Sequence, residues 1–448
     1  MESSRKTLQP DLSARVEACL ARHILPATPA RICLGFSGGL DSTVLLHLLT
    51  NLRPRSAFEL FAVHVHHGLS PHADDWAEFA CQAARALEVE CTVAHVAVNR
   101  RAELGLEAAA RAARYAVFER QHCDALLLAQ HRDDQAETVL LNLLRGSGVR
   151  GLAAMPECRQ LENGAQVLRP LLDIPRSELL AYAQIHGLRW VEDESNADQS
   201  LDRNFLRHAV FPQLQAVFPG VHATLARTAE HLAEADTILG DLARTDLQYC
   251  LKDEGFDLAA AACLSSVRMR NALRYWLNSS GVVPDARAFD ALLSMMCESR
   301  LDAMPVWVWR EHAVRRFQHR LYLTPASIRI GAPVEFEWQG RAVMPVSAWG
   351  GTLRWNKVSE GVGIAERFLA GRLALRARRG GEGLRLLAGG PTRSLKHLYQ
   401  EAGVPPWLRE RTPLLWIDDR LAAVPGLWIA AEFLEQGGWQ ASWHQSAG

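Results

Sequence analysis

The sequence has few lysines, no CxxC pair and no long apolar run. Only four of its 49 basic residues are lysines, namely Lys6, Lys252, Lys357 and Lys396, so 45 are arginines. The 50 acidic residues leave a formal net charge of −1. This balance excludes a uniformly basic nucleic-acid binder but allows a local basic patch. Arginine suits bidentate contacts with phosphate, although a biased genome composition explains the imbalance equally well.

The absence of a long apolar run and the use of cysteine in this chain indicate the cellular compartment. No stretch of about 18 apolar residues is present, so no transmembrane helix is predicted. The first residues contain no apolar core of a secretory signal. The nine cysteines are odd in number and sit mostly among apolar neighbours, which is typical of reduced, buried thiols. We therefore expect a cytoplasmic protein that has no association with a membrane.

The order of short apolar runs and helical stretches predicts the fold class. At roughly 150 residues per domain, 448 residues correspond to about three domains. Strands alternating with helices predict an α/β domain with a doubly wound parallel sheet and right-handed crossovers. The expected strands are residues 31–36, 59–65, 90–96, 124–129 and 166–172. The expected domains are residues 1–216, a mainly helical middle domain at 217–345, and a small α+β domain at 369–448.

A glycine-rich loop carries the clearest chemical signal. Ser37, Gly38, Gly39, Leu40, Asp41 and Ser42 follow the first strand and precede a helix. The glycines allow close approach of the backbone to a ligand, and the N–H groups at the helix start favour an anion. Asp41 would repel phosphate unless it holds Mg²⁺ between protein and phosphates. The loop lacks the Walker A ending and the GxGxxG pattern. The alternative is a strand-to-helix turn capped by serine.

A second polar block follows the fourth expected strand. It runs from Gln130 through His131, Asp134 and Glu137 to Thr138. Asp134 and Glu137 are three residues apart, so they share one helix face, near a helix start at the carboxyl edge of the sheet. Two carboxylates at this edge can bind Mg²⁺ or an ammonium group. A solvated helix N-terminus, which favours acidic residues anyway, explains them equally well.

Basic residues provide weaker signals. Arg111 and Arg114 share a helix face and are candidates for contact with phosphate, or they form a solvated face. Arg203, Asn204 and Arg207 form a similar group that either closes over the AMP or the cytidine of the tRNA, or forms an interdomain salt-bridge cluster. Residues 372–411 contain nine basic and three acidic residues, a local charge of +6 that suits tRNA phosphates. The candidate contacts there are Arg378, Arg379, Arg393, Lys396, Arg409 and Arg411.

Four histidines close together in the sequence suggest a metal site, but an alternative is favoured. His64, His66, His67 and His72 have no nearby cysteine, and their spacing is looser than that of closed zinc sites. A loop beside the active site is the favoured interpretation.

The loop sequence SGGLDS resembles that of the PP-loop ATP pyrophosphatases, which adenylate substrates with ATP. Further segments make the chain similar to the tRNA(Ile)-lysidine synthetase family. They are HHGLS (66–70), EAAARAARY (107–115), HRDDQAETVLLNLLRGSGVRGL (131–152), RPLL (169–172), DESNADQSLDRNFLRH (193–208), RRGGEG (378–383) and SLKHLYQEAGVPPWLRER (394–411). Relatives commonly have two adjacent histidines before the aspartate pair, whereas this chain has Gln130 at the first of them.

The resemblance implies a reaction and its participants. ATP adenylates the ring-2 carbonyl oxygen of the wobble cytidine in an isoleucine tRNA with a CAU anticodon. The side-chain amine of free L-lysine then displaces AMP, which changes decoding from AUG to AUA. Asp41, His131, Asp134 and Glu137 are the implied catalytic residues, with Mg²⁺ at Asp41 and Asp134. The implied ATP-binding set is the loop at 37–42 with Arg111 and Arg114. A monomer or a homodimer is expected.

Three rival functions remain to be weighed. A tRNA thiolase generally needs catalytic or cluster-binding cysteines, and Cys33, placed in the first strand, is a poor nucleophile. A non-catalytic tRNA-binding protein has no need of carboxylates facing RNA phosphates. A glutamine-dependent amidotransferase needs a cysteine-centred glutaminase, and no such module is evident.

Overall fold

The computed structural model describes residues 11–24, 30–56, 58–98, 105–252, 255–300, 303–327 and 330–445. Contacts group the chain into two units, residues 1–241 and 242–448, and each unit is considered by itself. Within the described ranges, every helix is too short or too polar to span a bilayer.

The first unit is built on a six-stranded sheet with the order β3-β2-β1-β4-β6-β5. Neighbouring strands are parallel except β5, which pairs antiparallel with β6. The predicted parallel sheet is therefore confirmed. The short strand β5 was not predicted, because its residues Cys158, Arg159 and Gln160 form no apolar run. The strands are β1 (Ala30–Gly35), β2 (Phe58–His66), β3 (Glu90–His95), β4 (Ala125–Leu127), β5 (Cys158–Gln160) and β6 (Gln166–Leu168).

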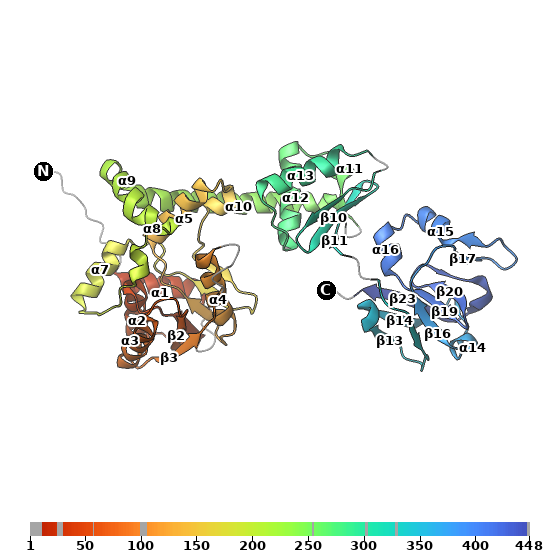
Figure 1. Cartoon of the computed structure of the whole chain (residues 1–448), viewed down its shortest axis with the longest axis horizontal. Helices are drawn as coiled ribbons and strands as arrows, with labels where there is room; N and C mark the ends of the chain where they lie inside the picture. The colour runs from red at the N-terminus through yellow and green to blue at the C-terminus, as the bar shows by residue number, and fades with distance from the viewer. Residues whose placement is uncertain are drawn as a thin grey trace. The chain divides into compact units, whose positions relative to one another are not determined.

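Helices cover both faces of this sheet and enclose two separate cores. Successive strand residues point to opposite faces. Ile32 and Leu34 of β1 therefore face the core under α1, α2, α3 and α7, while Cys33 faces the core under α4. Figure 1 shows α1, α2 and α3 on one side of the strands and α4 on the other. The helices are α1 (Leu12–His23), α2 (Leu40–Leu52), α3 (Ala73–Ala86), α4 (Leu106–Glu119) and α7 (Arg176–Ile185).

The position of β1 between β2 and β4 creates a crevice at the carboxyl edge of the sheet. After β3 the chain crosses back to β4 on the other side of β1, so the loops after β1 and β4 diverge to opposite sides. Such switch points are where open α/β sheets bind ligands. The loop after β1 leads into α2, and the loop after β4 leads into α5 (Arg132–Leu144).

A series of short helices follows and ends in one long helix. The tract from residue 202 to 217 is helical in three pieces, with a π-helical turn in the middle. Such turns are rare and often occur at functional sites. The elements are α6 (Val149–Leu152), η1 (Glu194–Ala197), α8 (Asp202–Phe205), η2 (Leu206–Val210), α9 (Phe211–Val217) and α10 (Val221–Cys250).

The second unit begins with a helical region that also contains a sheet. Its helices confirm the predicted helical character, and their apolar faces pack on an antiparallel sheet with the order β7-β8-β11-β10-β9. The elements are α11 (Leu258–Ala261), α12 (Ser266–Ser279), α13 (Ala286–Glu298), β7 (Leu251–Lys252), β8 (Gly255–Asp257), β9 (Val306–Trp309), β10 (His312–Phe317) and β11 (Arg320–Pro325).

The remainder of the second unit contains antiparallel sheets around a core rich in leucine and tryptophan. Two strands that begin before residue 345, β12 and β13, pair with strands of this part. The strands are β12 (Val334–Phe336), β13 (Val343–Val346), β14 (Gly351–Lys357), β15 (Val362–Ile364), β16 (Leu373–Arg376), β17 (Gly383–Leu384), β18 (Arg393–Ser394), β19 (Leu414–Ile417), β20 (Arg420–Val424), β21 (Trp428–Ile429), β22 (Leu434–Gln436) and β23 (Trp439–Gln445). The helices are α14 (Glu366–Leu369), α15 (Leu395–Glu401) and α16 (Pro406–Arg411), with short turns η3 (Ser347–Trp349) and η4 (Ala431–Phe433).

A substitution of Gly35, at the end of β1, tests how tightly the crevice is packed. A Cβ atom on Gly35 would lie 2.7 Å from Leu128 Cδ2 and 2.9 Å from Phe118 Cζ, and both side chains are buried. We expect Gly35→Ala to lower the free energy of unfolding by about 1 to 3 kcal/mol, measured by urea denaturation. Gly220→Ala, where the new Cβ would meet open space, is the control. Equal stability of the two variants would contradict tight packing at β1.

Candidate active site

The glycine-rich loop has a tightly turned backbone directly after β1. Gly38 has a φ angle of +81°, a conformation that side chains disfavour. Its carbonyl oxygen accepts a hydrogen bond from the Val191 amide at 2.9 Å, which ties the loop to the segment after α7. Gly39 is the N-cap of α2 and makes no side-chain cap, so the first N–H groups of α2 remain available to an anion.

Two serine hydroxyls stabilise this turn. Ser37 Oγ lies 3.0 Å from Ser42 Oγ and accepts a hydrogen bond from the Gly39 amide at 3.3 Å. The Ser42 hydroxyl donates to the Gly39 carbonyl at 3.1 Å. The loop is therefore already in a folded conformation that presents hydroxyl and N–H groups, which lowers the cost of ordering it around a ligand.

A cavity of about 700 Å³ opens beside the loop. Residues of the loop, the strand ends and the start of α5 line it, including Ser37, Asp41, Arg114, Gln130 and Asp134. Its size and position at the switch point fit a nucleotide-sized ligand. His64, His66 and His67 line the same cavity, which agrees with a loop beside the active site. Among the described residues, these histidines do not form a metal-ligating group.

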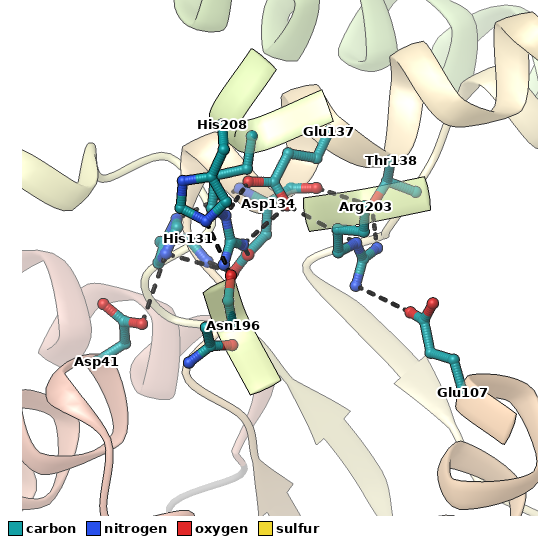
Figure 2. A network of polar contacts seen from close by, with 10 residues as sticks. Asp41, Glu107, His131, Asp134, Glu137, Thr138, Asn196, Arg203 and His208 are labelled. Carbon is teal, nitrogen blue, oxygen red and sulfur yellow. Dashed lines mark hydrogen bonds and ion pairs between the residues drawn. The ribbon is translucent and has the colours of Figure 1, made fainter. Parts of the chain in front are cut away.

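His131 joins the two predicted carboxylates at the cavity edge (Figure 2). Its Nε2 atom lies 3.5 Å from an oxygen of Asp41 and 3.5 Å from an oxygen of Asp134. His131 is also the N-cap of α5. Its Nδ1 accepts from the Asp134 amide at 3.3 Å, and the Asp134 carboxylate accepts from the His131 amide at 3.1 Å. This reciprocal cap fixes the ring between the loops that follow β1 and β4.

The charge state of His131 is under two opposing influences. Burial lowers the pKa of His131, but the carboxylates of Asp134, Asp41 and Asp133 outweigh burial and raise the pKa to about 9. The cap to the Asp134 amide, in contrast, requires an unprotonated Nδ1. In the neutral ring the proton then lies on Nε2 and faces Asp41. Either form directs an N–H group at the Asp41 carboxylate.

Glu137 is almost fully buried behind this pair and is held by arginines from the 202–210 tract. Arg207 donates to both Glu137 oxygens, at 2.6 and 2.9 Å, and to Asp134 at 3.2 Å. Arg203 lies 3.7 Å from Glu137 and donates to the Thr138 hydroxyl at 3.0 Å. Burial raises the pKa of Glu137, and the Arg207 hydrogen bonds oppose this shift. The bidentate contact is the geometry in which arginine binds carboxylates most strongly.

The basic group at 203–207 thus makes intramolecular contacts in the first unit. The Asn204 side chain is buried and donates to the Asp198 carbonyl at 2.9 Å. His208 contacts the carbonyl of Asn196 at 2.8 Å (Figure 2). These bonds fasten the turn at 193–201 to the tract at 202–210. The two arginines of the group therefore form salt bridges in this structure, but within the first unit and not between domains.

The two arginines of α4 differ in position. Arg114 lines the cavity, and its Nε is buried without a hydrogen-bond partner in the structure. Burial and the nearby Arg111 lower the pKa of Arg114. Arg111 is exposed, and its guanidinium lies 5.1 Å from the centre of the Tyr115 ring rather than along the cavity. The structure brings Arg114 to the loop and leaves Arg111 outside.

One buried arginine at the site was not identified from the sequence. Arg169 is only 2% exposed, and its Nε donates to the Gln130 side chain at 2.8 Å. Its Nη1 donates to the Pro156 carbonyl at 2.7 Å. Gln130 is therefore held in the cavity wall by a buried cation. An arginine immediately after an apolar strand was the available signal, but its burial depends on contacts with distant segments.

The six basic candidates of the C-terminal region have different environments. Arg393 is paired with Glu401, Arg378 lies 3.8 Å from Glu382, and Arg409 donates to the Val404 carbonyl at 2.7 Å. Arg379 and Lys396 are exposed, and their side chains make no ion pair within the described part of the chain. Arg411 is half-buried. The free positive charge here is smaller than the sequence count suggests.

Known families match all three regions of the chain. A PP-loop domain matches residues 10–214, a TilS substrate binding domain matches residues 256–322, and a TilS substrate C-terminal domain matches residues 373–443. The chain is 42% identical over 440 residues to the tRNA(Ile)-lysidine synthase of Alkalilimnicola ehrlichii, which covers 96% of this chain and 97% of the relative. The chain belongs to the tRNA(Ile)-lysidine synthase family. The resemblance seen in the motifs is thereby confirmed.

A second relative agrees with this assignment. The tRNA(Ile)-lysidine synthase of Chromobacterium violaceum is 43% identical over 92% of this chain and 94% of its own length. Among solved structures, the U34-tRNA thiolase of Methanococcus maripaludis is 22% identical over 50% of this chain and 78% of its own, with a TM-score of 0.43. A TilS C-terminal domain is 23% identical over 26% of this chain and all of its own, with a TM-score of 0.22.

His64 provides a test of how the crevice is held at β1. Its ring is buried, and Nδ1 donates to the Phe36 carbonyl at 3.0 Å, just before the loop. Burial lowers the pKa of His64 below its ordinary value of 6.5. The stability that the neutral ring provides is therefore present above that value and is lost as the pH falls below it.

We expect the free energy of unfolding to fall more steeply between about pH 7 and about pH 5 in the wild type than in His64→Asn, which keeps an N–H donor but does not titrate. The exposed His122 gives the control variant His122→Asn, expected to follow the wild type. The measurement is urea denaturation at each pH. An identical pH slope for His64→Asn would show that this ring does not contribute.

Proposed function

We propose that this chain attaches the side-chain amine of free lysine to ring carbon 2 of the wobble cytidine in isoleucine tRNA with a CAU anticodon. ATP first adenylates the carbonyl oxygen at that position and releases pyrophosphate. The amine then displaces AMP. The observation that carries the proposal is the meeting of Asp41 and Asp134 at His131, beside a PP-loop in a nucleotide-sized cavity.

The loop at 37–42 binds the phosphates of ATP in this proposal. Its free N–H groups at the start of α2 and the hydroxyls of Ser37 and Ser42 are donors that suit a leaving pyrophosphate. Arg114, which lines the same cavity, adds a positive charge. Because its Nε has no hydrogen-bond partner among the described residues, hydrogen bonding to a phosphate oxygen would satisfy a buried donor.

Asp41 and Asp134 fit the requirements of a Mg²⁺ site. Asp41 Oδ1 is buried and has no hydrogen-bond partner in the structure. A buried carboxylate oxygen without a donor is costly unless a cation binds it. Mg²⁺ prefers one or two carboxylates together with phosphate oxygens, and would neutralise charge on the phosphates. His131 then holds the two carboxylates apart at a fixed distance.

Asp134 and Glu137, both on α5, have separate tasks. Asp134 lines the cavity, so it receives the lysine ammonium and assists the loss of its proton. Glu137 is bound on both oxygens by Arg207, so it holds the 202–210 tract against the site. Arg207 also contacts Asp134, so a positive charge lies beside the expected amine site, where it favours the neutral amine over the ammonium form.

The thiolase alternative is disfavoured by the cavity wall. Sulfur transfer generally uses cysteine thiolates as nucleophiles or cluster ligands. Among the residues described, no cysteine lines the cavity beside the loop. Cys33 is buried in β1 with its side chain in the core under α4.

Removal of the Asp41 charge tests the nucleotide chemistry. Asp41→Asn is expected to lower tRNA-dependent pyrophosphate release by about a hundredfold or more, because the carboxylate that holds the metal is lost. tRNA affinity is expected to stay close to that of the wild type. The assay contains purified protein, Mg²⁺, ATP and isoleucine tRNA transcript, with and without lysine, followed by the nucleoside mass. Asp290→Asn, a surface carboxylate on α13, is the matched control.

Retention of wild-type pyrophosphate release by Asp41→Asn would refute the role of Asp41. Pyrophosphate release by the wild type with no lysine-dependent mass gain at the wobble cytidine would refute lysine as the nucleophile while keeping the adenylation step.

The C-terminal candidates make a prediction about tRNA affinity. Arg379→Ala and Lys396→Ala are each expected to weaken tRNA binding and to reduce the slope of log affinity against log salt by about 1, because each side chain is free to contact a phosphate. Arg393→Ala is the control, since its guanidinium is paired with Glu401. The measurement is filter binding over a range of salt concentrations. A larger effect from Arg393→Ala would place the tRNA elsewhere on this domain.

A further inference from the structure

Three side chains outside the ATP cavity bring a thiol, an imidazole and a carboxylate together. Cys19 and His23 lie one turn apart on the same face of α1, and Glu157 lies immediately before β5. One ligand atom of each lies within 4.8 Å of the others. Within the described part of the chain, this is the group of His, Cys, Asp and Glu side chains whose geometry suits a metal ion.

Packing holds these side chains in place from both sides. Val16 and Leu20 of α1 are buried in the core under the sheet, which fixes the face that carries Cys19 and His23. Cys19 itself is 1% exposed. The backbone carbonyl of Glu157 accepts a hydrogen bond from the Arg169 amide at 2.9 Å, at the end of the β5–β6 pair. The three ligand atoms thus converge from two independently anchored segments.

The set of donor atoms selects the kind of metal. A thiolate sulfur with an imidazole nitrogen and one carboxylate oxygen suits zinc, whereas Mg²⁺ and Ca²⁺ prefer oxygen ligands alone. Zinc holds such atoms at about 2.0 to 2.3 Å, which places tetrahedral ligands roughly 3.3 to 3.8 Å apart. The three ligand atoms lie within 4.8 Å of one another, so any excess over this range is small enough for side-chain rotation to remove. His23 Nε2 and Glu157 Oε2 are already 3.0 Å apart.

The surroundings resemble the outer shell of a metal site. Arg22 donates to Glu157 Oε1, which leaves Oε2 directed at His23. Hydrogen bonds of this kind commonly orient carboxylates that bind metals. Arg22 and Glu157 also line a second cavity of about 740 Å³, and the His23 and Glu157 side chains are both partly exposed, so solvent can reach this group. Burial and Glu157 raise the pKa of Cys19 to about 12, so without a metal this thiol stays protonated.

We propose that Cys19, His23 and Glu157 bind Zn²⁺, with a solvent molecule as the fourth ligand. The metal displaces the thiol proton of Cys19, which leaves to solvent, so that three ligands with two negative charges neutralise one Zn²⁺ ion. The bound metal links α1 to the segment just before the edge strand β5. It is separate from the ATP cavity, and no step of the proposed reaction depends on it.

The test uses Co²⁺ as a spectroscopic probe on the full chain, stripped of metal by chelator and reduced. The wild type is expected to bind one Co²⁺ with a thiolate-to-cobalt charge-transfer band and the visible bands of tetrahedral cobalt, and Zn²⁺ is expected to displace it. Cys19→Ser is expected to abolish the charge-transfer band. His23→Gln, at a less buried position, is expected to weaken Zn²⁺ binding about a hundredfold or more.

Cys158→Ser is the matched control, because Cys158 is adjacent to Glu157 but lies outside the group. It is expected to keep the band and the affinity. Circular dichroism checks that each variant is folded, and one equivalent of Zn²⁺ is expected to raise Tm in the wild type and in Cys158→Ser alone. Absence of a charge-transfer band from the folded wild type would overturn the proposal, leaving His23 and Glu157 as an ordinary ion pair. So would unchanged Zn²⁺ affinity in folded His23→Gln. Pyrophosphate release is measured in parallel, and its loss or survival bears only on the ATP site.

Discussion

The parallel pairing of β1 with both β2 and β4 is the constraint on which the site depends. Because the chain reverses direction across the sheet at β1, the loops after β1 and β4 separate and leave a crevice between them. The first loop brings Asp41, and the second brings His131 and Asp134. Neither loop has a complete set of groups for nucleotide chemistry. The sheet brings them together, and His131 keeps them at a fixed separation by capping α5 while facing Asp41.

Electrostatic balance explains why the acidic residues can be buried there. Burying a carboxylate without a partner is expensive, and the cost is offset when hydrogen bonds satisfy both oxygens. Glu137 receives this compensation from Arg207, with Arg203 nearby. Asp41 does not, since one of its oxygens has no donor. The same site therefore contains a satisfied carboxylate that organises the fold and an unsatisfied one that is available to a cation. This difference follows from the positions of Glu137 and Asp41 in the fold, since both side chains end in the same carboxylate group.

Arginine in this chain serves structure as often as recognition. The sequence groups Arg203 and Arg207 as candidates for nucleic-acid contact, yet both bind carboxylates of α5. Arg169 is buried and supports Gln130 at the position where relatives commonly have histidine. In the C-terminal region Arg393 is paired, whereas Arg379 is free. The net charge of +6 in residues 372–411 is thus carried by side chains that differ in how available they are to bind phosphate. The guanidinium group suits both uses because its fork of donors matches carboxylates and phosphates alike.

The sequence by itself determined the family, the alternating α/β order and the loop at 37–42, because these depend on local patterns of apolar, glycine and acidic residues. It also placed Asp134 and Glu137 on one helix face, since helical spacing is local. Only the tertiary structure decided that Asp134 lines the cavity and Glu137 lies behind it, that Arg114 faces the loop while Arg111 does not, and that Arg169 is buried. It also revealed the antiparallel strand β5, which contains no apolar run that would mark it in the sequence. These features depend on contacts between residues far apart in the chain, and residue spacing carries no information on such contacts.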